Sequence, residues 1–242
     1  MSLESLTIIE GILGIISISI TVFLGIKMIS KYFVFKKIEF ITMGLTMIFV
    51  SNGWWGSALA FVLYALFNFE ISDTLYIFIS YGLSPIAFMF WTYTFCHLVY
   101  RKLKWQIVGV FLAISVLYEI FFFTFLFSNP SILAERVART DSEANLYVFS
   151  YLIFILLTTL ITYTIFFRQC LKSENSKIRL KGLFIYIGII IFIIGTFIDA
   201  FISLTILTLF ITRMILIFSG ILTYIGWVMP NRVAKWIIKD QM

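Results

Sequence analysis

The chain has few of the residues on which most catalytic and metal sites are built. Its 242 residues include one histidine, two cysteines and three prolines, and only 12% are charged. One histidine and the separate Cys96 and Cys170 cannot supply the grouped ligands of a zinc or haem site. The HExxH, GxSxG and P-loop patterns are also missing. We therefore expect no enzyme activity, no metal, no cofactor and no disulfide framework.

What the chain has instead is apolar sequence. Hydrophobic residues make up 62% and the mean hydropathy is +1.06, whereas a soluble domain is about half apolar. Several runs exceed 18 residues and are continuously apolar, as in helices that cross a ~30 Å hydrocarbon core. The sequence predicts an all-α integral membrane protein with one domain of seven transmembrane helices. The expected spans are 6–28, 39–67, 74–100, 105–127, 146–167, 182–202 and 204–229.

The lysines and arginines are placed asymmetrically. Four, three, five and three of them fall in the first, third and fifth links and the C-terminal tail, fifteen of the eighteen in the chain. Cations concentrate on the cytoplasmic side of membrane proteins. This predicts a multi-pass protein of the cell membrane with the N-terminus outside and the C-terminus in the cytosol. The first run lacks the basic start and cleavage site of a signal peptide, so we expect it to stay as a helix.

The net charge of +6 does not predict nucleic-acid binding, because the cations lie in short clusters between apolar runs. We expect these clusters to meet anionic lipids of the inner leaflet and to offer a surface to a cytosolic signalling partner. No pattern sets an oligomeric state. The tail 230–242 places Val233, Trp236 and Ile237 on one helical face and cations on the other. It is either a short amphipathic helix on the inner leaflet or a basic tail that only anchors the topology.

Four ionisable residues fall inside expected spans, where they are costly and often functional: Glu10, Glu119, Asp199 and Arg213. At 1.5 Å per residue, Glu10 and Asp199 lie roughly 6 Å from the outer boundary, and the other two about 12 Å. Because the seventh helix of a ring neighbours the sixth and the first, Arg213 should reach Asp199 and also approach Glu10. The group is an outward polar pocket, a structural ion pair, or a pair of carboxyls that face headgroups.

The second span carries polar and aromatic residues in the middle of the expected membrane. Asn52 needs hydrogen-bond partners there, and Trp54 and Trp55 are too deep for an interfacial belt. Small residues recur four apart in the segment 51–60, which allows another helix to approach closely. The segment therefore serves either helix packing or ligand contact. In the third span, Pro85 predicts a kink.

The plan of seven spans with the N-terminus outside resembles the microbial rhodopsins. The last span contains no lysine, and the one lysine within the expected spans, Lys27, stands at the basic end of the first, so a retinal Schiff base is excluded. The chain is more similar to the seven-helix membrane sensor regions of prokaryotic histidine kinases and to their stand-alone archaeal relatives. The similarity rests on Asn52-Gly53-Trp54-Trp55, Leu83-Ser84-Pro85, Tyr118-Glu119 and Gly226-Trp227-Val228-Met229-Pro230. The resemblance implies a sensor that signals through a partner, and it transfers no individual site residue.

Three functions follow as hypotheses. The first is a receptor-like sensor whose outward pocket is formed by Arg213, Asp199, Glu119, Asn52, Glu10, Trp54 and Trp55. The second is a transporter of a small polar or anionic solute that uses the same charges. The third is a structural or lipid-interacting membrane protein. Transport usually needs polar residues through the inner half of the bundle as well, and the first, fourth and sixth spans are aliphatic or aromatic there. This favours the sensor.

Overall fold

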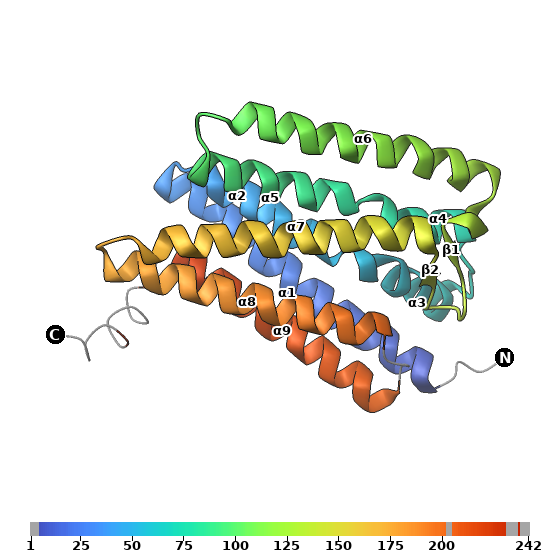
Figure 1. Ribbon diagram of the computed structural model, residues 1–242. Coiled ribbons are helices and arrows are strands. Elements are labelled where there is room, and N and C mark those ends of the chain that lie inside the picture. The colour runs from blue at the N-terminus through green and yellow to red at the C-terminus, as the bar shows by residue number, and fades with distance from the viewer. Residues whose placement is uncertain (1–4, 202–204, 231–236, 238–242) are drawn as a thin grey trace.

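The computed structural model describes residues 5–201, 205–230 and 237, and it is 85% helical (Figure 1). Seven helices are long and apolar enough to cross a membrane, as predicted. In chain order they are α1 (Ser5–Phe35), the run α2 (Glu39–Val50), η1 (Ser51–Trp54) and α3 (Trp55–Phe67), the run α4 (Asp73–Ile77), η2 (Phe78–Gly82) and α5 (Ser84–Val99), then α6 (Lys104–Ser128), α7 (Leu146–Leu171), α8 (Ser176–Phe201) and α9 (Ile206–Val228). The chain is therefore a helical bundle with the composition of a multi-pass membrane protein.

Several helices extend further than predicted at their basic ends. α1 continues to Phe35 instead of residue 28, α7 to Leu171 instead of 167, and α8 starts at Ser176 instead of 182. Lysine and arginine are good helix formers, so the helices continue past the apolar segment into the charged one. The expected turn near residue 203 and most of the expected C-terminal helix lie outside the described residues. α9 ends just before Pro230, as predicted.

Six of the spans form a ring. α1 packs against α2 and α9, α2 against α5, and α7 against both α5 and α8, while α8 and α9 pack along their length. α6 packs on α5 and lies on the opposite side of the bundle from α8 and α9 (Figure 1). The expected neighbours of the seventh span, the sixth and the first, are thus confirmed. The close approach of α8 and α9 depends on Gly188, since a Cβ there would lie 3.1 Å from the Ser219 carbonyl oxygen.

Two spans are interrupted within their length, the second near its middle and the third in its first half. The second contains a 3₁₀ turn, η1, and the third contains a π-helical turn, η2, and these two turns contact each other. Pro85 lies in the first turn of α5, where its missing N–H costs little. The sequence predicted a kink at this proline, and the structure has a π turn that ends at Gly82, three residues before it. Such turns are frequent at functional sites.

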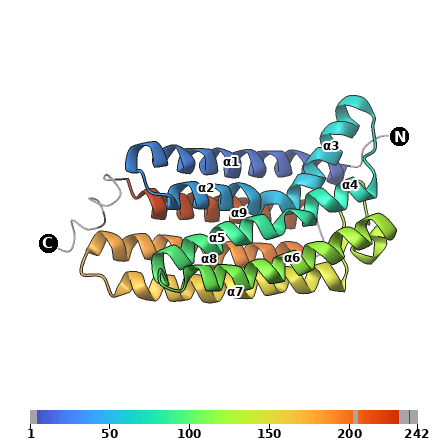
Figure 2. The ribbon, with the colours of Figure 1, turned by 90° about the horizontal axis from the view of Figure 1, so that it is seen from above.

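The two ends of the bundle differ. At one, the segment 129–145 forms a short 3₁₀ helix, η3 (Pro130–Ile132), and a small antiparallel hairpin of β1 (Ala134–Glu135) and β2 (Glu143–Ala144). We call this the hairpin end; α1 and α9 both start here (Figures 1 and 2). At the opposite end lie the cationic links 36–38, 100–103 and 172–175, and we call it the basic end.

Candidate functional site

A buried ion pair joins the last two spans near the hairpin end. Arg213 Nη1 of α9 donates to Asp199 Oδ1 of α8 at 2.8 Å, as expected from their positions. Two further donors converge on the same carboxylate: Trp54 Nε1 reaches Oδ2 at 2.8 Å, and Thr212 Oγ1 reaches Oδ1 at 3.2 Å. Because Trp54 belongs to the second span, one carboxylate connects three helices of the ring. We call these four residues the Asp199 cluster.

The guanidinium of Arg213 is almost fully enclosed, with 3% of the residue exposed. Its Cζ lies 5.4 Å from the centre of the Trp54 ring, within range of a cation–π contact. Its Nε is buried and has no hydrogen-bond partner. A guanidinium has five N–H donors in a fixed planar arrangement, and a buried donor without an acceptor is unfavourable. Arg213 therefore retains an unused donor inside the bundle.

Glu10, the second expected neighbour of Arg213, connects the bundle to the hairpin segment. Its Oε2 accepts a hydrogen bond from Thr140 Oγ1 at 2.7 Å, and both residues are buried. The Thr140 carbonyl oxygen in turn accepts from the Tyr76 hydroxyl at 2.8 Å, which also contacts Ser57 Oγ at 3.0 Å. This burial argues against the interpretation that Glu10 faces lipid headgroups. The hairpin segment reaches over the end of the bundle and covers the Glu10 carboxyl.

Two arginines hold the hairpin segment in place. Arg136 Nη1 donates to the Ile71 carbonyl oxygen at 2.9 Å and to Asp73 Oδ1 at 3.1 Å. Arg139 pairs with Glu70 through Nε at 2.9 Å and also through Nη2. Each of the two therefore binds the turn between α3 and α4.

Asp141, beside Thr140 in the hairpin segment, adds a further carboxyl near the cluster. Burial raises the pKa of Asp141 above its usual range. The backbone N–H of Ser142 donates to Asp141 Oδ1 at 2.9 Å, and this hydrogen bond lowers the Asp141 pKa. The nearby Asp199 carboxylate acts in the opposite direction and raises the Asp141 pKa further. Sequence reasoning did not single out Asp141 or Thr140, because each is 50 or more residues distant in the chain from the spans that it meets.

The polar residues of η1 divide between packing and the cluster. Asn52 Nδ2 donates to the Ser80 carbonyl oxygen at 3.1 Å and to Ser84 Oγ at 3.3 Å, which links the second and third spans. A Cβ on Gly56 would lie 2.0 Å from Ser80 Oγ, so this glycine permits the close approach. Trp55 Nε1 bonds to Ser51 Oγ within its own turn at 2.9 Å. The packing interpretation therefore fits Asn52, whereas Trp54 belongs to the Asp199 cluster.

Glu119 is separate from the other candidates. It lies on α6, the helix outside the ring, next to Tyr118, whose ring stacks on Tyr147 and Tyr151 of α7. Its Oε2 is buried without a hydrogen-bond partner. The structure thus brings Arg213, Asp199 and Trp54 into direct contact and Glu10 close to the hairpin, and it leaves Asn52, Trp55 and Glu119 at other places.

Other site types find no support in the part of the chain that the structure describes. No three His, Cys, Asp or Glu side chains there are grouped to hold a metal ion. Cys96 and Cys170 are free and buried. His97 Nε2 lies 3.6 Å from Glu39 Oε1 near the basic end, at the opposite end of the bundle from the Asp199 cluster.

Comparisons of the chain with protein-family models, with curated proteins and with solved structures found no match.

Proposed function

We propose that the protein is a receptor-like membrane sensor that binds a small ligand at the Asp199 cluster. The observation that carries this proposal is the buried Arg213, whose Nε donor is unused while Asp199 occupies its Nη1. Ionisable groups in membrane-spanning helices are costly, and those that are kept tend to mark functional sites. A ligand that supplies an acceptor to Nε would relieve the cost of the unpaired donor.

The arrangement also offers a way to pass on the binding event. Asp199 connects the second, sixth and seventh spans through Trp54 and Arg213, and Glu10 connects the first span to the hairpin segment through Thr140. A ligand that prefers one arrangement of these bonds would shift the population of helix positions toward that arrangement. The change would reach the basic end through whole helices, because α1, α8 and α9 each run between the two ends.

The proposal places the hairpin end outside and the basic end in the cytosol. Among the described residues, the hairpin end carries Arg136 and Arg139, whereas the links and adjoining helix turns of the basic end carry most of the other cations. The asymmetry follows the positive-inside rule. The basic end would then meet anionic lipids and a signalling partner.

Single cysteines test this orientation, because the native Cys96 and Cys170 are buried and should not react in the folded protein. Ala138 in the hairpin segment and Glu174 in a basic link are both exposed. A membrane-impermeant maleimide should label Ala138→Cys in intact cells and Glu174→Cys only after lysis. The reverse pattern would show the opposite topology and place the cluster on the cytosolic side.

Ligand binding is tested on the purified protein and on proteoliposomes. A panel of free amino acids, short carboxylic acids and acylglycerols is screened for a rise in the unfolding temperature, and solutes that bind are then tested for flux. Binding without flux supports a sensor, and flux that requires Arg213 supports a transporter instead. If the variant Asp199→Leu with Arg213→Leu keeps the full binding of every compound found, the cluster is structural and the proposal fails.

A further inference from the structure

Three carboxyl groups at the hairpin end share one guanidinium. Glu10 lies within electrostatic range of Asp141, Asp199 and Arg213, and Asp141 lies within range of the last two. The guanidinium is always protonated, and it already pairs with Asp199 at 2.8 Å. Three ionised carboxyls and one guanidinium would give a formal net charge of −2. This excess would fall on a region where Glu10 is buried and Asp141 is half-buried.

Hydrogen bonds decide which of the carboxyls carry the excess. Asp199 accepts three of them, and bonds of this kind favour its anion. Glu10 accepts one, from Thr140 Oγ1, and Asp141 accepts one, from the Ser142 N–H. Burial and the Asp199 carboxylate both raise the pKa of Asp141. Neighbouring carboxyls with so few donors do not both ionise readily, so Glu10 and Asp141 are the groups that titrate together.

Asp141 belongs to the hairpin loop, residues 136–142 between β1 and β2. The base of the hairpin is fixed, because Leu133 and Ala134 are buried in an apolar cluster. The loop itself is held from outside by Arg136 and Arg139, whose acidic partners have side chains that are 66% and 61% exposed. Exposed ion pairs contribute little to stability. The loop is therefore the part that can open without loss of the bundle core.

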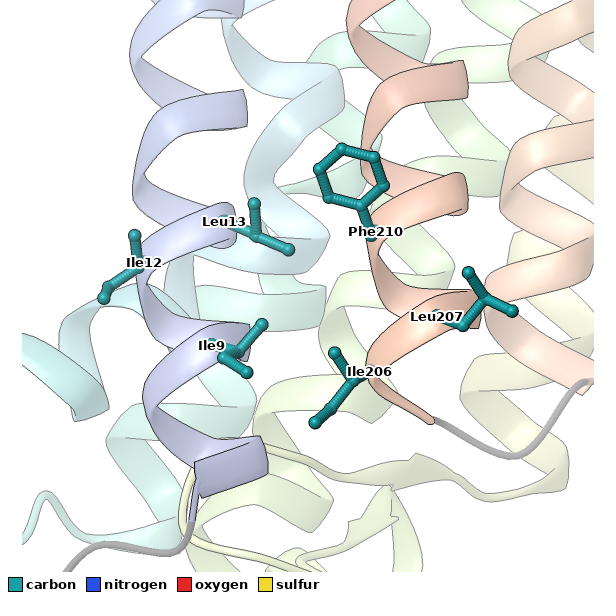
Figure 3. A pocket seen from close by; sticks show the side chains of 6 residues that line it. All are labelled: Ile9, Ile12, Leu13, Ile206, Leu207 and Phe210. Atoms are coloured by element: carbon teal, nitrogen blue, oxygen red, sulfur yellow. The ribbon is translucent and has the colours of Figure 1, made fainter.

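The closed loop separates the two carboxyls from water. Thr140 is fully buried over Glu10. Next to Glu10 lies a hollow between the first turns of α1 and α9, which Figure 3 shows from close by, and its lining is apolar throughout: Ile9, Ile12, Leu13, Ile206, Leu207 and Phe210. Such a lining gives water no hydrogen-bond partner, so this hollow does not hydrate Glu10. When the loop opens, Asp141 enters water and Glu10 loses its cover, so both carboxyls gain hydration.

From these contacts we infer that the hairpin loop is a proton-dependent cover, which stays closed over Glu10 while Glu10 and Asp141 hold a proton between them and opens when they lose it. The inference rests on the proposed sensor function and adds the regulation of the same site: acid at the hairpin end closes the route from water to the Asp199 cluster. The two carboxyls titrate as a coupled pair, so the proton belongs to both.

The direction of the effect follows from linkage. The pKa of Asp141 is raised in the closed loop, and in the open loop it returns to its usual range because the carboxyl is hydrated. A carboxyl of this kind stabilises the closed loop below its usual pKa, and this contribution is lost as the pH rises through the raised pKa. Opening therefore releases a proton, and a higher pH favours the open loop.

The other groups around Asp141 leave this sign unchanged. Asp199 and Glu143 disfavour its anion, and Arg213, which favours it, is already paired. The titratable groups of the third span that face the pair are phenols, which are uncharged near neutral pH: Tyr76 and Tyr81.

The test measures amide hydrogen exchange in the hairpin loop of the full chain, in phosphatidylcholine nanodiscs and without a ligand. The ratio of intrinsic to observed exchange rate removes the pH dependence of the exchange chemistry and leaves the protection of the loop. Release of one proton on opening changes this protection by up to about tenfold per pH unit. We expect protection to fall about tenfold or more between about pH 5 and about pH 8. Protection that is constant or rises with pH would overturn the cover.

Two substitutions remove the titrating groups and keep their shapes. Glu10→Gln with Asp141→Asn should leave protection independent of pH, and Asp141→Asn alone should weaken the dependence. The matched control is Glu135→Gln, an exposed carboxyl of β1 in the same hairpin, which should behave as the wild type does. Unfolding temperatures show which variants are folded, and Asp141→Asn provides the test by itself if Glu10→Gln prevents folding. A wild-type pH dependence in Asp141→Asn or in the double variant would overturn the inference.

This experiment and the ligand screen fail separately. Protection that does not respond to pH overturns the cover and leaves the sensor function standing. Full ligand binding by the variant Asp199→Leu with Arg213→Leu overturns the sensor function, whatever the loop does.

Discussion

Replacing Asp199 with leucine should be among the most destabilising single changes in the bundle. The substitution leaves the guanidinium of Arg213, 3% exposed, without its partner and removes the acceptor of Trp54 Nε1. Removal of one member of a buried ion pair costs about 3–5 kcal/mol. For a chain of this length, each kcal/mol lowers the unfolding temperature by roughly 2–4 °C. We therefore expect Asp199→Leu to unfold roughly 6–20 °C below the wild type.

The double variant Asp199→Leu with Arg213→Leu should recover much of this loss. Replacement of a buried pair by apolar residues is often neutral or stabilising. What remains is the unpaired indole N–H of Trp54, which costs about 1–3 kcal/mol when buried. The double variant should thus be more stable than the single one, even though it lacks two polar side chains.

A thiol-reactive dye measures these differences directly, because Cys96 and Cys170 are buried and become reactive on unfolding. The control is Phe218→Leu, a change of an exposed apolar residue on α9, which should shift the unfolding temperature only slightly. If Asp199→Leu shifts the temperature no more than this control, or if the double variant is less stable than the single one, then the pair does not stabilise the bundle in the way argued.

Three further outcomes follow from single contacts. Gly56→Ala should lower the free energy of unfolding in urea or detergent by about 1–3 kcal/mol, because the new Cβ overlaps Ser80 Oγ. A Cβ at Gly53 meets nothing within 4 Å, so the control Gly53→Ala should be neutral or slightly stabilising. Equal losses of stability in the two variants would refute the packing role of Gly56. Arg136→Gln should release the hairpin segment and speed its limited proteolysis, and an unchanged cleavage rate would contradict this. Burial raises the pKa of Asp141, so folding disfavours its anion and stability falls as pH rises through that pKa. Asp141→Asn should therefore raise the unfolding temperature at neutral pH and flatten its pH dependence, and a lower unfolding temperature at neutral pH would show that the anion is favourable.

The spans were predictable because hydropathy is a local property of the chain. A run long enough to cross the hydrocarbon core is visible without knowledge of any neighbour. The pairing of Arg213 with Asp199 was also predictable, since the sixth and seventh spans are consecutive and the last turn of the sixth must lie beside the first turns of the seventh. The ends of α1 and α8 were misplaced because charge was taken to end a helix, whereas Lys31 and Lys177 continue it.

The closure of the hairpin end could not be deduced in the same way. Thr140 and Glu10 are 130 residues apart, and Trp54 is 145 residues from Asp199. Neither hydropathy nor helical periodicity carries information on such contacts. One signal was available in the sequence. Arg136 and Arg139 fall on the same predicted side of the membrane as Glu70 and Asp73, and opposite charges close together on one surface tend to pair. The backbone changes at η1 and η2 had only Pro85 as a local sign.

The distribution of polar groups between the second and third spans favours a sensor over a transporter. Near the basic end, Thr42 Oγ1 and Thr94 Oγ1 are 2.6 Å apart, and Asn52 forms the next polar contact between these spans, ten residues further along the second span and so roughly 15 Å away. The layer between them is buried and largely apolar, with Met43, Met47, Phe88 and Trp91. Trp91 is held by a stacked ring of Tyr163 at 3.5 Å. A polar solute that crossed this layer would lose its hydrogen bonds, so the polar groups at the hairpin end are better suited to bind a ligand from one side than to pass it through.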